Sequence, residues 1–169
     1  MKKEPGSTVE NEDDDKVVMI TPPSTLRDKV RVRANSTMDF GAASDAIAKL
    51  GVEFVTRLPG ELAVIRREFD AVRVAPADEI ARERLFRRVH DLKGQAGTFD
   101  FKLITIVGND LCRFLEQPVE MTARRLKVVE FHIEAMQRVA AQNITGTGGD
   151  QGMKMINTLQ GLTYKVLNE

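Results

Sequence analysis

Hydrophobic positions recur three and four residues apart along most of the chain, which is the spacing of one face of an α-helix. The first such segment places Ile47, Leu50, Phe54 and Leu58 at its apolar positions. The pattern as a whole predicts helices over 38–72, 77–97, 101–117, 122–144 and 153–167. No segment alternates apolar and polar residues as a half-buried strand does.

Short connectors between these amphipathic segments favour antiparallel neighbours. The predicted fold is therefore all-α: an antiparallel up-down four-helix bundle with an extra N-terminal helix and a flexible N-terminal tail. We expect Gly51 or Pro59-Gly60 to break or kink the first long helix, because glycine and proline are the usual causes of such interruptions.

Residues 1–36 have a different pattern from the rest of the chain. The segment 10–15 is nearly all acidic, and a short apolar run over 17–20 is followed by Pro22 and Pro23. We expect an acidic, flexible tail over 1–36, in which the apolar run is either disordered or packed as an extended strap on the bundle. A helical-bundle domain over 37–169 follows.

One predicted helix presents a histidine to solvent. Pro76 and Asp78 supply residues typical of a first helical turn. At about 100° per residue, the apolar positions of this helix fall on one stripe, which should face a core; they are Leu85, Val89, Leu92 and Ala96. His90 lies about 130° from the centre of that stripe, so we expect it to be exposed.

The residues around His90 are suited to phosphoryl chemistry. An exposed neutral imidazole offers a nitrogen lone pair that can attack phosphorus. Lys93, one turn further on, and Arg87, one turn back, can neutralise phosphoryl oxygens. Gly94 and Gly97 each cost about 1 kcal/mol relative to alanine inside a helix, which indicates that something must come close to this face. Phe86 would be an apolar contact for that partner.

The run His90-Asp91-Leu92-Lys93-Gly94, followed by Gly97 and Phe99, resembles the signature of histidine-containing phosphotransfer (HPt) domains. The run Leu111-Cys112-Arg113-Phe114-Leu115-Glu116 resembles a phrase of that family's next helix. Two departures stand out. Asp100 occupies the place of the family's usual second glycine. The Leu-Cys phrase comes about one helical turn later than is common in the family. The sequence therefore does not identify which side chains of this second helix reach a phosphoryl group.

The resemblance implies a phosphoryl carrier with phosphotransfer activity, not an ATP-dependent kinase. His90 would relay a phosphoryl group between aspartates of response-regulator receiver domains in a two-component phosphorelay, with a hybrid sensor kinase as a further partner. Lys93 would stabilise the phosphate, and Arg87 is a second candidate for this role. Phe86, Gly94, Gly97 and Phe99 would contact the partner. The chain would need no cofactor, because Mg²⁺ would belong to the receiver domain.

Two other functions stay open at this point. One is a non-phosphorylated helical adaptor that binds receiver or kinase domains through the same face. The other is an unrelated helical enzyme using Cys112 or His90, although a free cysteine beside Leu111 is typical of a small buried hydrophobe. We interpret His132 as structural or as lying at the core boundary. Residues 146–152 are glycine-rich without phosphate-loop or dinucleotide spacing, so we expect a flexible loop there.

Charge and composition exclude several classes of function. Lysine plus arginine and aspartate plus glutamate both number 25, so no basic field attracts nucleic acid or acidic membranes. No segment reaches the roughly 18 apolar residues of a membrane helix. Two histidines and one cysteine leave no ready zinc site, and a single cysteine fits a reducing cytoplasm. We expect a cytoplasmic monomer without a metal ion.

Overall fold

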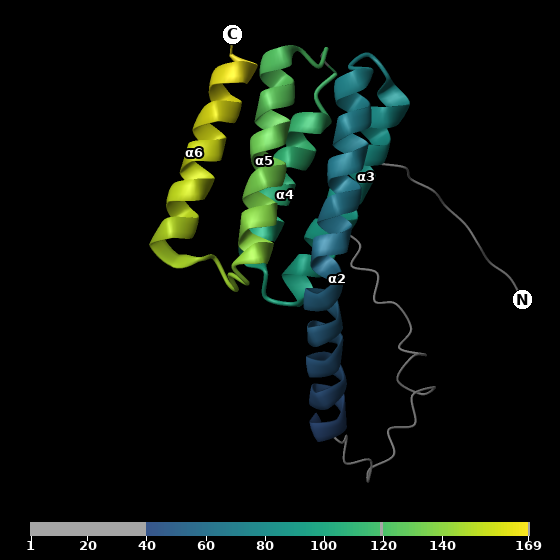
Figure 1. Cartoon of the computed structure of the whole chain (residues 1–169). Coiled ribbons are helices and arrows are strands. Elements are labelled where there is room, and N and C mark those ends of the chain that lie inside the picture. The colour runs from purple at the N-terminus through teal and green to yellow at the C-terminus, as the bar shows by residue number, and fades with distance from the viewer. Residues whose placement is uncertain (1–39, 119, 169) are drawn as a thin grey trace, which may run out of the picture. The chain divides into compact units, whose positions relative to one another are not determined.

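The computed structural model describes residues 40–118 and 120–168, and this part of the chain is helical, without strands. Its five helices are α2 (Phe40–Val74), α3 (Glu79–Thr98), α4 (Lys102–Leu115), α5 (Ala123–Ala141) and α6 (Gly149–Leu167) (Figure 1). The all-α class is therefore confirmed for these residues. The acidic tail predicted over 1–36, with its apolar run, lies outside the described residues.

Helix α2 is continuous over 35 residues and carries Pro59 in its interior. The helix is not broken at Gly51 or at Pro59-Gly60, so the first form of the prediction is wrong, and the alternative of a kink stays a prediction. Proline removes the hydrogen bond to the carbonyl four residues earlier, that of Val55. Both Val55 and Pro59 are exposed, so water can satisfy that carbonyl, and the apolar stripe of α2 is buried on either side of the proline.

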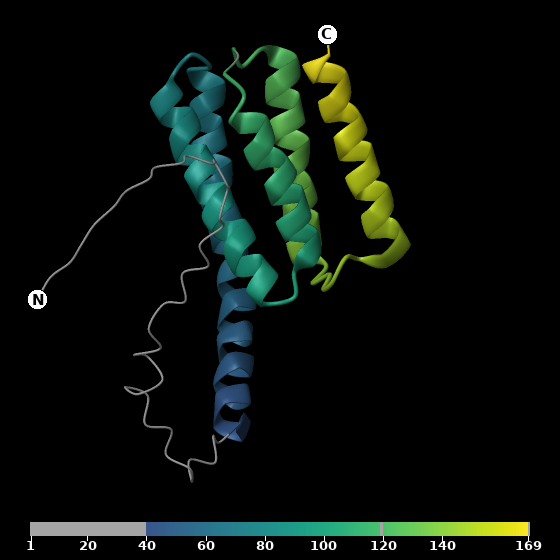
Figure 2. The same ribbon diagram turned by 180° about the vertical axis from the view of Figure 1, so that it is seen from behind.

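The helices contact one another in a closed cycle. Helix α2 packs against α3 and α5, and α4 packs against the same two helices. Helix α6 packs outside this cycle, on α4 and α5, and both views show it at the edge beside α5 (Figure 2). The predicted extra N-terminal helix is therefore a member of the cycle, and α6 is the added helix. The reason is apolar burial: α6 buries only Gly152, Ile156 and Leu159.

Apolar side chains from all five helices form one core. The stripe predicted for α3 is confirmed, since Leu85, Val89, Leu92 and Ala96 are buried. The prediction of apolar positions for α2 fails at its N-terminal end, where Ile47 is 61% and Leu50 is 52% exposed. Figure 1 shows α2 continuing past the ends of the helices beside it, so no other described helix covers this part of its stripe.

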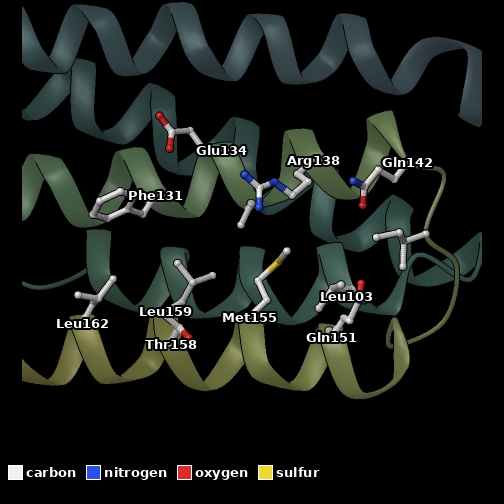
Figure 3. Close-up of a pocket in the computed structure, with 13 residues that line it drawn as sticks. Leu103, Phe131, Glu134, Arg138, Gln142, Gln151, Met155, Thr158, Leu159 and Leu162 are labelled. Carbon is white, nitrogen blue, oxygen red and sulfur yellow. The ribbon is translucent and has the colours of Figure 1, made fainter.

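A pocket of about 560 Å³ lies between α5 and α6. Side chains of the two helices face one another across it, including Phe131 and Arg138 from α5 and Met155 and Leu159 from α6 (Figure 3). Leu103 of α4 also lines it. None of its lining residues belongs to α3, so this pocket is separate from the helix that carries His90.

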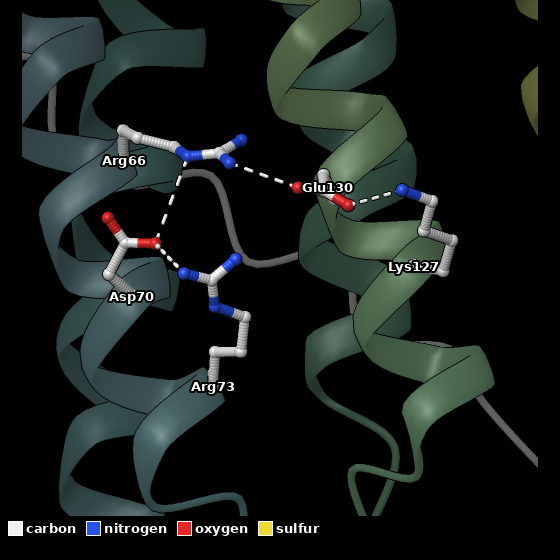
Figure 4. Close-up of polar contacts among 5 residues, drawn as sticks. All are labelled: Arg66, Asp70, Arg73, Lys127 and Glu130. Carbon is white, nitrogen blue, oxygen red and sulfur yellow. Dashed lines mark hydrogen bonds and ion pairs between the residues drawn. The ribbon is translucent and has the colours of Figure 1, made fainter.

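A group of charged residues links α2 to α5 (Figure 4). Arg66 Nη2 donates to Glu130 Oε1 at 3.0 Å, and Lys127 Nζ donates to Glu130 Oε2 at 2.7 Å. On α2, Asp70 Oδ1 lies 3.3 Å from Arg73 Nη2 and 3.9 Å from Arg66 Nε. The hydrogen bond from Lys127, supported by that from Arg66, holds the pKa of Glu130 below its usual value against a smaller raising effect of burial.

Candidate phosphotransfer site

Helix α3 fixes the orientation of His90. The Asp78 carboxylate caps its start, accepting hydrogen bonds from the N–H groups of Ile80 at 2.9 Å and Ala81 at 3.1 Å. Because Val89 and Leu92 are buried on either side of it in sequence, His90 turns away from the core. Its side chain is 57% exposed, which confirms the exposure predicted from the helical period.

The imidazole of His90 has two neighbours on its own helix. The Phe86 ring lies one turn earlier, with ring centroids 5.8 Å apart, and is itself partly buried against the core. Asp91 Oδ1 lies 3.9 Å from Nδ1. This distance is too long for a hydrogen bond, but the negative charge stands on the Nδ1 side of the ring.

Lys93 is half-buried and points toward the next helix. Its Nζ donates to Asn109 Oδ1 of α4 at 3.2 Å, and its main-chain carbonyl accepts from Thr105 Oγ1 at 3.1 Å. Sequence reasoning found neither Asn109 nor Thr105. The signal available was Gly108, since a glycine inside a helix indicates close approach by another element.

Arg87 is exposed and paired within its own helix. Its Nε donates to Glu83 Oε1 at 2.7 Å. The guanidinium therefore already has a carboxylate partner, and only an exchange of that partner would free it for a phosphoryl group. Of the two cations predicted to flank His90, Lys93 is the one bonded to a neutral group.

The two glycines of the predicted docking face differ in their surroundings. A Cβ added at Gly94 would meet nothing within 4 Å, so this position is open. A Cβ at Gly97 would lie 3.3 Å from Thr105 Oγ1. Gly97 thus makes room for α4, whereas only Gly94 leaves unobstructed space one turn from His90.

Phe99 packs against the core. Its ring stacks on Phe54 of α2, with centroids 4.9 Å apart, and its Cδ1 lies 3.7 Å from the Cβ that Gly51 lacks. Much of the Phe99 ring is therefore occupied by contacts inside the molecule. Phe86, beside His90, is the better placed of the two predicted aromatic contacts for a partner.

The turn between α3 and α4 explains the departure at Asp100. This residue has φ +62°, in the left-handed region that glycine enters most readily and that aspartate tolerates better than most residues. Its carbonyl accepts the N–H of Gly146 at 2.6 Å, which ties the turn to the loop before α6. A glycine would adopt the same backbone conformation, so the turn can form with Asp100 in the place of the family's usual glycine.

Cys112 and His132 are both buried, and neither is placed for chemistry with His90. Burial raises the pKa of the Cys112 thiol to about 11, with Lys93 lowering it and Glu116 raising it to smaller extents. A thiol protonated at neutral pH is a poor nucleophile. His132 is 0% exposed, and its Nδ1 donates to the Val128 carbonyl at 2.8 Å, which places it in the core rather than at its boundary.

The glycine-rich segment is partly helical, which differs from the prediction. Helix α6 begins at Gly149, four residues earlier than the expected 153, and Gly146, Gly148 and Gly149 all adopt positive φ. These angles favour glycine and allow a compact connection to α5. The loop prediction is wrong for residues 149–152, which belong to α6, whereas residues 146–148 do lie in the connection between α5 and α6.

Within the described residues, no group of three or more histidine, cysteine, aspartate or glutamate side chains could hold a metal ion. None of the described helices combines the length and apolar character needed to cross a membrane. The chain matches no protein-family model, no curated protein and no solved structure.

Proposed function

We propose that this chain is a histidine-containing phosphotransfer protein, in which His90 takes a phosphoryl group from the phosphoaspartate of one receiver domain and passes it to the aspartate of another. One observation carries the proposal: the exposed imidazole of His90 stands one turn from Lys93 and beside the open position Gly94. The likeness of residues 90–99 to the HPt signature supports the same assignment.

The proposed fold is an antiparallel up-down four-helix bundle of α2–α5 with α6 added. Short connectors and the closed cycle of helix contacts support it. In such a bundle α3 and α4 form a hairpin, so residues of α4 face Lys93. Asn109, which follows Lys93 by 16 positions, is one of them.

The transfer step forms one bond and breaks one. The Nε2 lone pair of His90 forms a bond to phosphorus while the bond from phosphorus to the aspartyl oxygen breaks, and the carboxylate of the receiver leaves with that electron pair. The charge of Asp91, 3.9 Å from Nδ1, favours the tautomer that keeps the proton on Nδ1 and leaves Nε2 free. Positioning and charge stabilisation provide most of the acceleration in such transfers.

The partners are receiver domains and a hybrid sensor kinase that supplies the first phosphoaspartate. The magnesium ion of the reaction belongs to the acidic site of the receiver, and no step uses ATP on this chain. Phe86 supplies an apolar contact at the rim of the site, and Gly94 lets the aspartyl loop of the receiver approach. A cytoplasmic monomer would suit such a carrier.

The test is transfer of radiolabel from a phosphorylated receiver domain. We expect the wild-type chain to take up label that is stable in alkali and labile in acid, and His90→Gln to take up none because the nucleophile is gone. Circular dichroism of the variant checks that its helices remain. Undiminished labelling of His90→Gln would contradict the proposal. Binding of the receiver without any transfer to the wild-type chain would instead favour the adaptor function.

A further inference from the structure

The hydrogen bond between Lys93 and Asn109 joins the histidine helix to its neighbour. Lys93 Nζ lies 3.2 Å from Asn109 Oδ1, and both side chains are partly buried. The two residues are 16 positions apart, and the bond runs from α3 to α4. The long side chain of Lys93 therefore has one defined direction instead of the many that an exposed lysine samples.

The backbone around this bond holds the two helices close together. A Cβ at Gly108, the residue before Asn109, would lie only 3.0 Å from Lys93 Cβ. Thr105 Oγ1, one turn earlier on α4, donates to the Lys93 carbonyl at 3.1 Å. Gly108 and Thr105 thus fix α4 against α3 at Lys93, and they place the Asn109 amide at the ammonium.

The partner of Lys93 is neutral, which distinguishes it from the other cation near His90. Arg87 is paired with the Glu83 carboxylate at 2.7 Å. Among the described residues, no carboxylate forms an ion pair with Lys93. An amide oxygen can fix the position of an ammonium group without cancelling its charge. Lys93 is accordingly held in place while keeping its full attraction for an anion.

We propose that Asn109 is the positioning residue of this site: its amide holds the uncancelled charge of Lys93 where it stabilises a phosphoryl group on His90. The inference rests on the proposed function and extends it to the second helix. Asn109 acts through Lys93 and does not itself react. The essential property of the side chain is a neutral acceptor, which makes aspartate an informative replacement.

The experiment uses phosphoramidate, a small phosphoryl donor that needs no receiver domain. The Nε2 lone pair of His90 forms the bond to phosphorus while the phosphorus–nitrogen bond of the donor breaks. The donor nitrogen is already protonated at neutral pH, so ammonia leaves with that electron pair. The rate of labelling is measured for the full-length wild type, for Asn109→Ala, Asn109→Asp, Asn109→Gln and Lys93→Ala, and for the double variant Asn109→Ala/Lys93→Ala. His90→Gln gives the background, and Asn157→Ala, an exposed asparagine on α6, is the matched control.

We expect Asn109→Ala to slow labelling of His90 about tenfold, the rate equivalent of losing one hydrogen bond to a charged group. Asn109→Asp should be slowed as well, because its carboxylate would hold the ammonium but neutralise it. Asn109→Gln should recover part of the rate, and Asn157→Ala should match the wild type. With Lys93→Ala already present, Asn109→Ala should have no further effect, since the two residues act as a unit.

Three results would overturn the inference: a wild-type rate for Asn109→Ala, a wild-type rate for Asn109→Asp, or an equal loss from Asn109→Ala with and without Lys93. Equal thermal unfolding of the single variants separates positioning from loss of structure. If phosphoramidate labels His90 with this pattern but no phosphorylated receiver does, the proposed relay function fails and the role of Asn109 stands. If neither phosphoramidate nor a phosphorylated receiver labels His90 in the wild type, both fail.

Discussion

The two histidines of the chain differ most clearly in how far their side chains are buried. His90 is 57% exposed on α3, whereas His132 is 0% exposed on α5. His132 Nδ1 donates to the Val128 carbonyl, and Nε2 has no hydrogen-bond partner among the described residues. Burial lowers the pKa of His132, with the Val128 carbonyl and the charge of Asp110 opposing this to a smaller extent. The side chain is therefore held neutral in the core.

This burial predicts a dependence of stability on pH. The unfolded chain binds a proton at His132 with a pKa near 6.5, and the folded chain binds it only at lower pH. The free energy of unfolding should therefore fall as the pH drops below about 6.5, and keep falling until the folded-state pKa is reached. Urea denaturation between about pH 7.5 and pH 5.5 measures this slope.

The other histidine provides the control for that experiment. His132→Asn should flatten the slope in this window, whatever it does to the absolute stability, because the titrating group is removed. His90→Gln should leave the slope in place, since His90 is exposed. A slope that survives His132→Asn and disappears in His90→Gln would contradict the assignment.

At the scale of elements, the pair α3 and α4 decides what each residue near His90 can do. Gly97 and Gly108 both lie where the two helices meet, against Thr105 and Lys93 respectively, whereas Gly94 faces open space. Three glycines of similar appearance in the sequence therefore have two different roles. Two permit the close packing of the helices, and one keeps the surface beside His90 clear.

This difference predicts opposite effects of alanine. Gly94→Ala should raise the free energy of unfolding by about 0.5–1 kcal/mol, because alanine is the better helix former and its methyl group meets nothing. Gly108→Ala should lower it by about 1–3 kcal/mol, because the new Cβ would lie 3.0 Å from the stiffly held Lys93 Cβ. Chemical denaturation measures the free energy of unfolding of both variants. A change of the same sign in both would contradict the different roles assigned to Gly94 and Gly108.

At the scale of the whole described domain, the helix cycle is closed between α2 and α5 by charged as well as apolar contacts. Glu130 accepts from Arg66 across the gap and from Lys127 within its own helix. Its carboxylate is only 16% exposed, so it is partly shielded from solvent. Since the pKa of Glu130 is lowered, its stabilisation is present above pH 4.5 and is lost as the pH falls through the folded-state pKa.

A double-mutant cycle tests this cross-link. Arg66→Gln and Glu130→Gln should be coupled by about 0.5–1 kcal/mol at neutral pH, the size expected of a partly exposed ion pair. The coupling should shrink toward zero at a pH below the folded-state pKa of Glu130, because the protonated carboxyl no longer carries a charge. The same cycle with Arg73→Gln, which pairs with Asp70 on α2, should show no coupling to Glu130. Coupling that is equal at both pH values would mean that the contact is not ionic.

The sequence by itself determined the helical class, the buried stripe of α3 and the exposure of His90. These are local properties, because the rotation of about 100° per residue fixes which side chains share a face of one helix. The helical period also placed Lys93 on the same face as His90, but it did not predict which residue the ammonium group of Lys93 contacts.

The tertiary structure alone decided the contacts between segments distant in sequence. The bond from Lys93 to Asn109 depends on the register of α3 against α4, and the stacking of Phe99 on Phe54 depends on where α2 passes the turn. The exposure of Ile47 and Leu50 depends on where the neighbouring helices end. Packing also kept α2 continuous through Pro59, since burial on both sides of the proline outweighs one missing hydrogen bond. No helical period contains this information, because it arises only when separate helices bury their faces against one another.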